Sequence, residues 1–352
     1  MIDFKSLKID ALLVSSPPNV RYLTGYTGSN GMALLTQDTL TLFTDPRYDI
    51  RAREEIMQAK MTAQVKVATK PLWEAAAQYI QRKRLKRIGF EQNHVTYAVY
   101  KTIDEKLSIG YSLKPVAAVV EELRMVKTGD EMRRIRRAVG TNSKAFEAAA
   151  KRIKTGVSEA DIAADLDFRM RKLGAEASAF PTIVASGPRT ALVHASPTGQ
   201  TVKPNELLLI DVGAAQDGYM SDMTRMLFLG KPDSKILAMY QAVLEAQLAA
   251  IDAVREGAGT WQVDRAARQV LKSTGLDKQF VHSTGHGLGL EIHEAPRIGK
   301  KDKTRLQAGM VITIEPGAYI EGFGGMRVED TVLVTKNGCE VLTPTSKELM
   351  VL

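Results

Sequence analysis

The fold is decided by the sequence from Glu206 to Leu229, which reads ELLLIDVGAAQDGYMSDMTRMLFL. Two apolar runs flank a short polar turn at Gln216–Asp217, a pattern typical of two antiparallel strands. The strands are expected over residues 206–215 and 218–229. This hairpin is the most informative part of the chain, because it carries two aspartates close together, Asp211 and Asp222.

Asp211 and Asp222 are expected to lie side by side in this hairpin. Pairing Ala215 with Gly218 and counting outward places the two aspartates directly opposite each other on one face. Like charges at such positions repel each other, and Asp211 follows the apolar run LLLI, so it is expected to be buried. The pair therefore needs a shared proton, a basic side chain such as Arg225, or a metal ion, and a metal ion is the interpretation that we favour.

A second hairpin repeats this arrangement. Strands are expected over Met310–Tyr319 and Met326–Val334, with Glu315 on the first and Glu329 on the second. Glu329 can face Glu315 across the turn Gly322–Gly325, but the length of this loop leaves the register open. Each glutamate alone would be a surface residue at a strand end, whereas their match to the first hairpin favours a functional role.

The order helix, helix, strand pair occurs twice, which predicts an internal duplication. IDVGA at 210–214 resembles IEPGA at 314–318, and DMT at 222–224 resembles EDT at 329–331. Acids match acids in the same order; coincidence between ordinary strand patterns is the alternative. Two such units packed about a pseudo-twofold axis would bring the four carboxylates together. The expected helices run over 128–154, 158–173, 233–255 and 260–273.

Two domains are expected, over residues 1–120 and 121–352. The first alternates between strand and helix signals, as in an α/β domain. A new region begins near residue 120, where Thr128 and Glu131 have the spacing of a capping box at the start of a long helix.

The histidines are few and clustered. His282, His286 and His293 lie in the segment 281–294, VHSTGHGLGLEIHE, where glycines flank His286 and permit close approach of the backbone. A phosphate-binding loop is the alternative for this glycine run, but the Lys-Ser/Thr pair of a P-loop is absent. His94 is expected to be a surface residue.

Four carboxylates and one imidazole would form an oxygen-rich metal site. Such a donor set suits Mn²⁺, with Co²⁺, Fe²⁺ or Zn²⁺ as alternatives, better than it suits a thiolate zinc site. Four carboxylates suffice for two bridged ions roughly 3.5–4 Å apart, which lower the pKa of a bridging water and polarise a carbonyl. Hydrolysis of an amide bond is the reaction that such a site predicts.

Composition limits the other classes of function. The 352-residue chain is 44% apolar, and its apolar runs fall short of the ~20 residues that cross a bilayer. The net charge is +8, and lysines and arginines are densest between Arg124 and Lys154. A solvent-exposed helix face is the favoured explanation for these cations. Nucleic-acid binding is the alternative, but no nucleic-acid-binding motif accompanies them. No signal peptide is visible and Cys339 is the single cysteine, so we expect a cytoplasmic location.

These residues resemble the pita-bread metallopeptidases, a family that includes methionine aminopeptidase, aminopeptidase P and prolidase. The resemblance implies an α/β creatinase-like N-terminal domain, followed by an α+β pita-bread catalytic domain with pseudo-twofold duplication. It also implies that Glu315 moves the proton of an activated water. The five metal-ligand positions of the family are filled by Asp211, Asp222, His286, Glu315 and Glu329.

The resemblance further implies which residues contact the substrate. His194 matches a histidine that stabilises the reacting peptide, and His293 matches one that contacts the scissile carbonyl. His282 matches a histidine of the proline-specific branch. Arg327 would support the metal ligands from behind and Tyr319 would line the site, with a packing or ion-pair role as the alternative for both.

Residues 19–25, NVRYLTG, and 44–48, TDPRY, resemble the creatinase-type domain of proline-specific members. Methionine aminopeptidases generally lack this domain, and creatinase lacks the metal ligands, so both activities are disfavoured. In the family this domain often reaches towards a partner subunit's active site, which implies a homodimer.

Two proline-specific activities fit the sequence. The segments 27–31, TGSNG, and 44–48 look closer to aminopeptidase P, which releases the first residue of Xaa-Pro peptides of varied length, and we favour this interpretation. The alternative is prolidase, which cleaves Xaa-Pro dipeptides: Arg297 matches an arginine that holds the dipeptide carboxylate, unless it is a solvated loop residue. A non-catalytic binding protein is a third alternative, disfavoured by the complete ligand set. The expected partners are proline-containing peptides, without nucleic acid or membrane.

Overall fold

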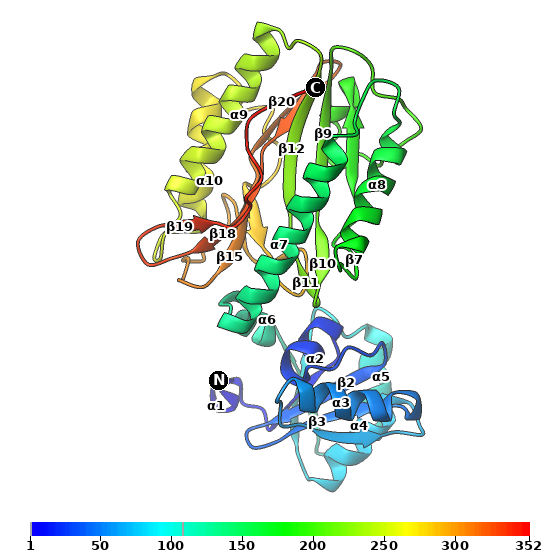
Figure 1. Cartoon of the computed structure of the whole chain (residues 1–352). Coiled ribbons are helices and arrows are strands. Elements are labelled where there is room, and N and C mark those ends of the chain that lie inside the picture. The colour runs from blue at the N-terminus through cyan, green and yellow to red at the C-terminus, as the bar shows by residue number, and fades with distance from the viewer. Residues whose placement is uncertain (1, 108) are drawn as a thin grey trace. The chain divides into compact units, whose positions relative to one another are not determined.

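The computed structural model describes residues 2–107 and 109–352 and divides at Arg124–Met125 into two compact units (Figure 1). The boundary expected from the sequence lies near residue 120. Within the described residues, no helix is both long and apolar enough to cross a membrane.

The N-terminal unit is a six-stranded sheet with helices on both faces. Its elements are α1 (Phe4–Leu7), β1 (Ala11–Val14), α2 (Pro17–Thr24), β2 (Gly31–Thr36), β3 (Leu40–Thr44), η1 (Pro46–Tyr48), α3 (Asp49–Gln58), β4 (Gln64–Val67), α4 (Leu72–Arg82), β5 (Arg87–Glu91), α5 (Tyr97–Lys106), β6 (Ser112–Val116) and α6 (Val119–Met125). The strand order is β4-β3-β2-β1-β5-β6. β1 is buried along its length because alternate residues enter two cores, Leu12 and Val14 on one face and Leu13 on the other.

The C-terminal unit combines two helix pairs with two central sheets. Its elements are α7 (Gly129–Ala150), α8 (Glu159–Lys172), β7 (Ala177–Ser178), β8 (Ile183–Ser186), η2 (Gly187–Ala191), β9 (Glu206–Val212), β10 (Ala214–Gln216), β11 (Tyr219–Met220), β12 (Met223–Leu229), α9 (Ser234–Asp252), α10 (Thr260–Ser273), β13 (Gly285–Gly287), β14 (Glu294–Ile298), β15 (Val311–Ile314), β16 (Gly317–Ile320), β17 (Gly324–Arg327), β18 (Asp330–Val334), β19 (Cys339–Val341) and β20 (Met350–Val351). The central sheets have the orders β20-β12-β9-β8 and β14-β13-β15-β18-β19.

The two halves of this unit repeat one plan. α7 and α8 pack together and precede the hairpin β9–β12, while α9 and α10 pack together and precede the hairpin β15–β18 (Figure 1). In each half, the residue that precedes the second helix bridges to a later loop: Ser158 to Thr201 in the first half and Gly259 to Arg305 in the second. This repeated plan is the duplication that the sequence predicts.

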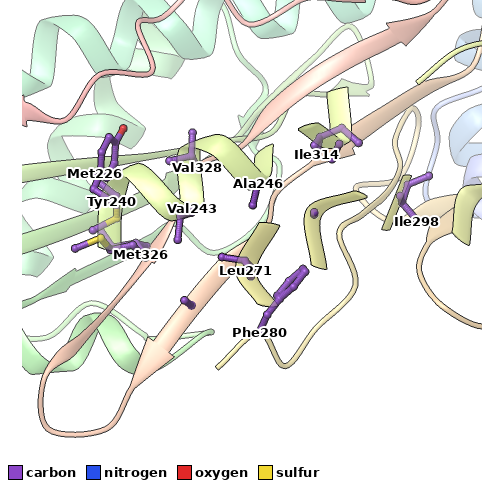
Figure 2. Packing of buried hydrophobic residues seen from close by; sticks show 14 of the residues in the cluster. Met226, Tyr240, Val243, Ala246, Leu271, Phe280, Ile298, Ile314, Met326 and Val328 are labelled. Carbon is purple, nitrogen blue, oxygen red and sulfur yellow. The ribbon is translucent and has the colours of Figure 1, made fainter. Parts of the chain in front are cut away.

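β9 is buried on both faces and separates two hydrophobic cores. Leu207 and Leu209 enter the core that α9 and α10 cover, whereas Leu208 and Ile210 enter the core that α7 and α8 cover. Figure 2 shows part of the first core, where labelled residues from both central sheets meet α9 and α10. The run LLLI is therefore apolar at every position because both faces of the strand are covered.

α7 begins with the predicted capping box. Thr128 N donates to Glu131 Oε2 (2.8 Å), and Glu131 N donates back to Thr128 Oγ1 (3.3 Å). The helix ends at Ala150 rather than at the predicted Lys154. Gly156, at a φ of 91°, then turns the chain towards α8.

The turn of the first hairpin differs from the predicted turn. Asp217 and Gly218 occupy it, both at positive φ (52° and 76°), and Gln216 pairs with Tyr219. Asp-Gly favours this kind of two-residue turn because both residues tolerate the left-handed conformation. The prediction of a turn at Gln216–Asp217 is therefore wrong by one residue.

The corrected turn changes the register by two residues. Asp211 pairs with Thr224 and not with Asp222. Since side chains alternate with a period of two, the shift leaves both aspartates on the same face, as diagonal neighbours.

The second hairpin has the register that brings its two glutamates together. Ile314 pairs with Asp330 at the end of β15–β18, and β16–β17 continues in the same register. Glu315 and Glu329 occupy the next position inward, so they stand opposite each other.

Candidate metal centre

The five residues predicted as metal ligands line one cavity of about 610 Å³. Asp211 lies in β9, Asp222 just before β12, His286 in β13, Glu315 just after β15 and Glu329 just before β18. Two of them come from the first half of the duplicated unit and three from the second. The cavity therefore lies where the two halves meet.

The imidazole of His286 stands between two carboxylates. Its Nε2 atom lies 3.5 Å from Asp222 Oδ2 and 3.5 Å from Glu315 Oε1. Its Nδ1 atom lies 3.0 Å from the carbonyl oxygen of Gly287; because a carbonyl only accepts, Nδ1 carries the proton and Nε2 is left as a ligand atom. Burial lowers the pKa of His286 to about 4, which keeps the ring neutral.

The carboxylates offer oxygen atoms that lack partners. Asp222, His286 and Glu329 each present one ligand atom, and these atoms lie within 4.8 Å of one another. The Oδ1 atoms of Asp211 and Asp222 are buried, and neither has a hydrogen-bond partner among the described residues. Unpaired buried oxygens are costly, and a bound cation would satisfy them. The residues therefore fit a divalent metal.

Burial and mutual repulsion both disfavour negative charge at three of the candidate ligands, Asp222, Glu315 and Glu329. Burial raises the pKa of Asp222 and of Glu329 well above the ordinary values, and neighbouring carboxylates raise both pKa values further. Burial also raises the pKa of Glu315 to about 7, although the positive charge of Arg327 opposes the rise. A cation bound here would remove the repulsion that holds these protons.

Arg327 is buried among the same carboxylates and is only 2% exposed. Its Nη2 donates to Asp211 Oδ2 (2.6 Å), its Nη1 to the hydroxyl of Tyr319 (2.7 Å) and its Nε to Thr224 Oγ1 (3.0 Å). One oxygen of Asp211 is thereby fixed, and the other is the unpaired Oδ1. Arg327 thus orients a candidate ligand without occupying both of its oxygens.

Thr224 belongs to the site, although the sequence analysis does not identify it. Its hydroxyl donates to Glu329 Oε2 (2.7 Å) and accepts from Arg327, so it joins the two halves beneath the carboxylates. A signal was present: DMT and EDT each place a threonine two residues after the acid, on the same strand face.

The residues expected to contact substrate also gather at the cavity. Those that line it are His194, His282, His293 and Arg297. The ring centroids of His293 and His286 lie 4.4 Å apart, and the two ring planes meet at 72°. Tyr319 is not among the lining residues; it lies behind them, with its hydroxyl 2.9 Å from Nε2 of His282.

Three further lining residues have no signal in the sequence. Phe180 and Ile292 supply apolar wall, and Thr182 contributes a buried hydroxyl that has no partner among the described residues. Folding brings them together from segments more than a hundred residues apart, so no local pattern connects them. An apolar wall of this kind suits a proline ring or an aliphatic side chain.

Glu159, the first residue of α8, holds the loop that carries His194. Its Oε1 accepts from Ser186 N (2.8 Å) and from Arg189 Nε (3.1 Å), and its Oε2 accepts from Thr198 N (3.0 Å). The side chain is fully buried. Both ends of the loop are thus tied to one carboxylate.

Glu159→Gln is expected to destabilise the protein by about 1–3 kcal/mol, since an amide cannot accept all of these bonds. Burial alone would raise the pKa of Glu159, but hydrogen bonds from Thr198 and Ser186 outweigh it and lower the pKa. A carboxylate with a lowered folded-state pKa stabilises the fold above its unfolded pKa, and this stabilisation is lost as the pH falls through the folded-state pKa. Melting temperatures measured from pH 7 down to pH 3 should therefore converge for wild type and variant at the acid end.

The control for this prediction is Asp165→Asn, which removes a partly exposed ion pair on the same helix. Equal losses of stability in the two variants would contradict the role assigned to Glu159.

The fold and the cavity define a metal-dependent hydrolase built on a duplicated unit. The chain belongs to metallopeptidase family M24: the profile of that family matches residues 133–336, and the profile of the Creatinase/Prolidase N-terminal domain matches residues 3–126. The family resemblance, the two-part fold and the status of an enzyme predicted from the sequence are confirmed. Membership of this metallopeptidase family implies that the protein binds a divalent metal ion, as the sequence predicts.

The similar proteins cover nearly the whole chain. The Xaa-Pro dipeptidase of Pyrococcus furiosus is 38% identical over 343 residues, which cover 97% of this chain and 95% of that protein. The solved structure of the Xaa-Pro dipeptidase from Bacillus anthracis has a TM-score of 0.95 and 35% identity, over 99% of this chain and 97% of that chain. The X-Pro aminopeptidase from Thermotoga maritima has a TM-score of 0.91 and 32% identity, over 99% of both chains.

Proposed function

We propose that this metallopeptidase is an Xaa-Pro dipeptidase, which hydrolyses the bond before proline in a dipeptide. The comparisons support this alternative better than the aminopeptidase P activity that the sequence analysis favours, because the Pyrococcus furiosus and Bacillus anthracis proteins are both named Xaa-Pro dipeptidases. The X-Pro aminopeptidase of Thermotoga maritima shares the fold at similar identity, so peptide length is the property to measure.

The position of Arg297 carries the proposal. Arg297 pairs with His286 across β13 and β14, so the two side chains lie on the same face of the sheet, and both line the cavity. A dipeptide has a free carboxylate directly after its proline, and a guanidinium binds a carboxylate through two charge-assisted hydrogen bonds. A longer peptide has an amide in that place and forgoes this interaction.

The candidate ligands would hold two divalent ions. The preferred ion in this proposal is Mn²⁺, with Co²⁺, Fe²⁺ or Zn²⁺ as alternatives, because the donor set is rich in oxygen. When bound, such a pair would supply a water of lowered pKa and would polarise the scissile carbonyl. The residues in this role are Asp211, Asp222, His286, Glu315 and Glu329.

The remaining roles fall to side chains around the ligands. The carboxylate of Glu315 accepts a proton from the attacking water and returns it to the proline nitrogen as the peptide bond breaks. His293 and His194, at the wall of the cavity, hold the peptide carbonyl and the reacting peptide. His282 orients the proline side of the substrate, and Arg327 keeps Asp211 in place.

The test compares hydrolysis of Ala-Pro and Ala-Pro-Ala-Ala by protein stripped with EDTA and reloaded with Mn²⁺. The proposal expects metal-dependent release of alanine from the dipeptide and poor turnover of the tetrapeptide. The reverse preference would establish the aminopeptidase P activity. No hydrolysis of either peptide by metal-loaded protein would overturn the substrate class.

Arg297→Met is expected to raise KM for Ala-Pro by about 10–100-fold with little change in kcat, since it removes a charge-assisted pair of hydrogen bonds to the substrate. Ala-Pro amide, which lacks the carboxylate, should be cleaved equally by variant and wild type. Arg265→Met, an exposed arginine outside the cavity lining, is the control. An unchanged KM for Ala-Pro would remove Arg297 from the binding site.

The predicted homodimer and cytoplasmic location stay predictions. Light scattering by the purified full-length protein would measure the first.

A further inference from the structure

Residues 280–284 carry His282 into the cavity without belonging to a helix or strand. The backbone groups of such a segment need partners from elsewhere in the fold. The carbonyl of Thr284 accepts from the backbone N–H of Glu315 (2.7 Å), so the segment also adjoins a candidate ligand. The carbonyls of Phe280 and His282 point to α10 instead, where a single side chain binds both.

That side chain is Arg268. Its Nη1 donates to the carbonyl of Phe280 (3.0 Å), and its Nη2 donates to the carbonyl of His282 (2.5 Å). Its guanidinium carbon lies 4.1 Å from the centre of the Phe280 ring. Phe280 packs into the same core as Leu271 of α10 (Figure 2), so the segment is held by both apolar and polar contacts.

Asp264, one helical turn before Arg268, completes the arrangement. It is 1% exposed, and its Oδ2 accepts from Arg268 Nε (2.8 Å). Its Oδ1 accepts from the hydroxyl of Thr284 (2.9 Å). The pair is therefore bonded to residues 280, 282 and 284, every second residue of the segment. A lysine at 268 could not bind two carbonyls and a carboxylate at once, because it lacks the planar fork of the guanidinium.

The fixed backbone also determines the chemical state of His282. Its Nδ1 lies 2.8 Å from the carbonyl oxygen of Ser283, which only accepts, so Nδ1 carries the proton. Its Nε2 lies 2.9 Å from the hydroxyl of Tyr319, which itself accepts from Arg327 (2.7 Å). Tyr319 therefore donates to Nε2, and the ring holds one tautomer only while its backbone stays in place.

We propose that Asp264 and Arg268 are positioning residues for His282: by binding the carbonyls of Phe280 and His282 and the hydroxyl of Thr284, they fix the place and the tautomer of the imidazole that faces the substrate. The inference rests on the proposed function, since His282 has a substrate-binding role only there. Asp264 and Arg268 act through His282 and do not themselves touch the substrate.

The test is Arg268→Gln in the full-length protein. We expect kcat/KM for Ala-Pro to fall about 10–100-fold, the range for removal of partners that orient a functional histidine. The ¹⁵N spectrum of histidine-labelled, Zn²⁺-loaded protein should change for His282 from a single Nδ1–H tautomer to averaged nitrogen shifts. If Arg268→Gln does not fold, Arg268→Lys replaces it: it keeps the charge beside Asp264 but loses the fork, and the same changes are expected.

The matched control is Arg169→Gln on α8. Arg169 bonds Asp165 one turn earlier on its own helix (2.7 Å), as Arg268 bonds Asp264. The control should lose little thermal stability, since its ion pair is partly exposed, and keep wild-type kinetics. Unchanged kinetics or an unchanged His282 spectrum in the Arg268 variant would overturn the proposal. If the wild type cleaves no Xaa-Pro peptide, the proposed function fails, and the spectrum alone decides whether Arg268 fixes His282.

Discussion

Asp222→Asn is expected to lower kcat/KM for Ala-Pro by about a thousandfold or more, equivalent to about 4 kcal/mol of lost metal-assisted catalysis. Asparagine keeps the volume of the side chain but loses its charge. Asp222 also supplies one of the buried unpaired oxygens, and its Oδ2 stands 3.5 Å from Nε2 of His286, so the substitution removes a charged ligand from the centre of the candidate site. Elemental analysis after dialysis should show less than the wild-type amount of metal per chain.

The thermal stability of Asp222→Asn should depend on metal in an unusual way. Without metal, the variant should melt no lower than the wild type, because one of several mutually repelling buried acids is gone. With metal, the wild type should gain stability and the variant should gain much less. Asp217→Asn, in the turn of the same hairpin, makes the same chemical change and should alter neither property. Full activity and full metal content in Asp222→Asn would exclude Asp222 as a ligand.

Arg327→Met is expected to act in the opposite direction on the metal-free protein. It leaves a hydrogen-bonded oxygen of Asp211 buried and unpaired, and it removes donors to Tyr319 and Thr224. Breaking a buried ion pair from one side costs about 3–5 kcal/mol, which corresponds to a melting temperature lower by about 10 °C. Activity should fall about 100-fold, because the orientation of Asp211 is lost as well.

Added metal should restore part of this stability, since a cation takes over some of the charge that Arg327 balanced. The comparison variant is Arg136→Met, which removes an exposed pair with Glu340 and should cost about 0–1 kcal/mol. A melting temperature for Arg327→Met that matches this variant in the absence of metal would show that the buried charge is not needed.

Local patterns predict which residues gather at the candidate metal centre of this protein. The apolar runs before Asp211 and Glu315 mark buried strands, and the repeated order of acids indicates the duplication that the structure contains. The capping box of α7 depends on residues three positions apart, so it too can be predicted. Each of these features depends on neighbours in the sequence.

Features that depend on a single residue of register, or on contacts between distant segments, are not predicted. Moving the turn from Gln216–Asp217 to Asp217–Gly218 changed the pairing of Asp211, although the period of two preserved its face. Thr224 and Arg327 meet across 103 positions, and although the match of DMT to EDT marks Thr224, no local pattern indicates this contact. Arg268 likewise cannot be distinguished in the sequence from other helix arginines, because its contacts with residues 280 and 282 form only in the folded protein.

The candidate ligands are divided between the two halves of the duplicated unit, and this division has a consequence for the life of the protein in a cell. A cation bound to Asp211 and Asp222 on one side and to Glu329 on the other would add a cross-link between segments that already meet through packing, hydrogen bonds and the buried ion pairs Arg225–Asp330 and Arg327–Asp211. Chains without bound metal would then separate more often where the two halves meet, and proteases would cleave them faster. We expect the amount of this enzyme in a cell, and not only its activity, to follow the supply of its metal.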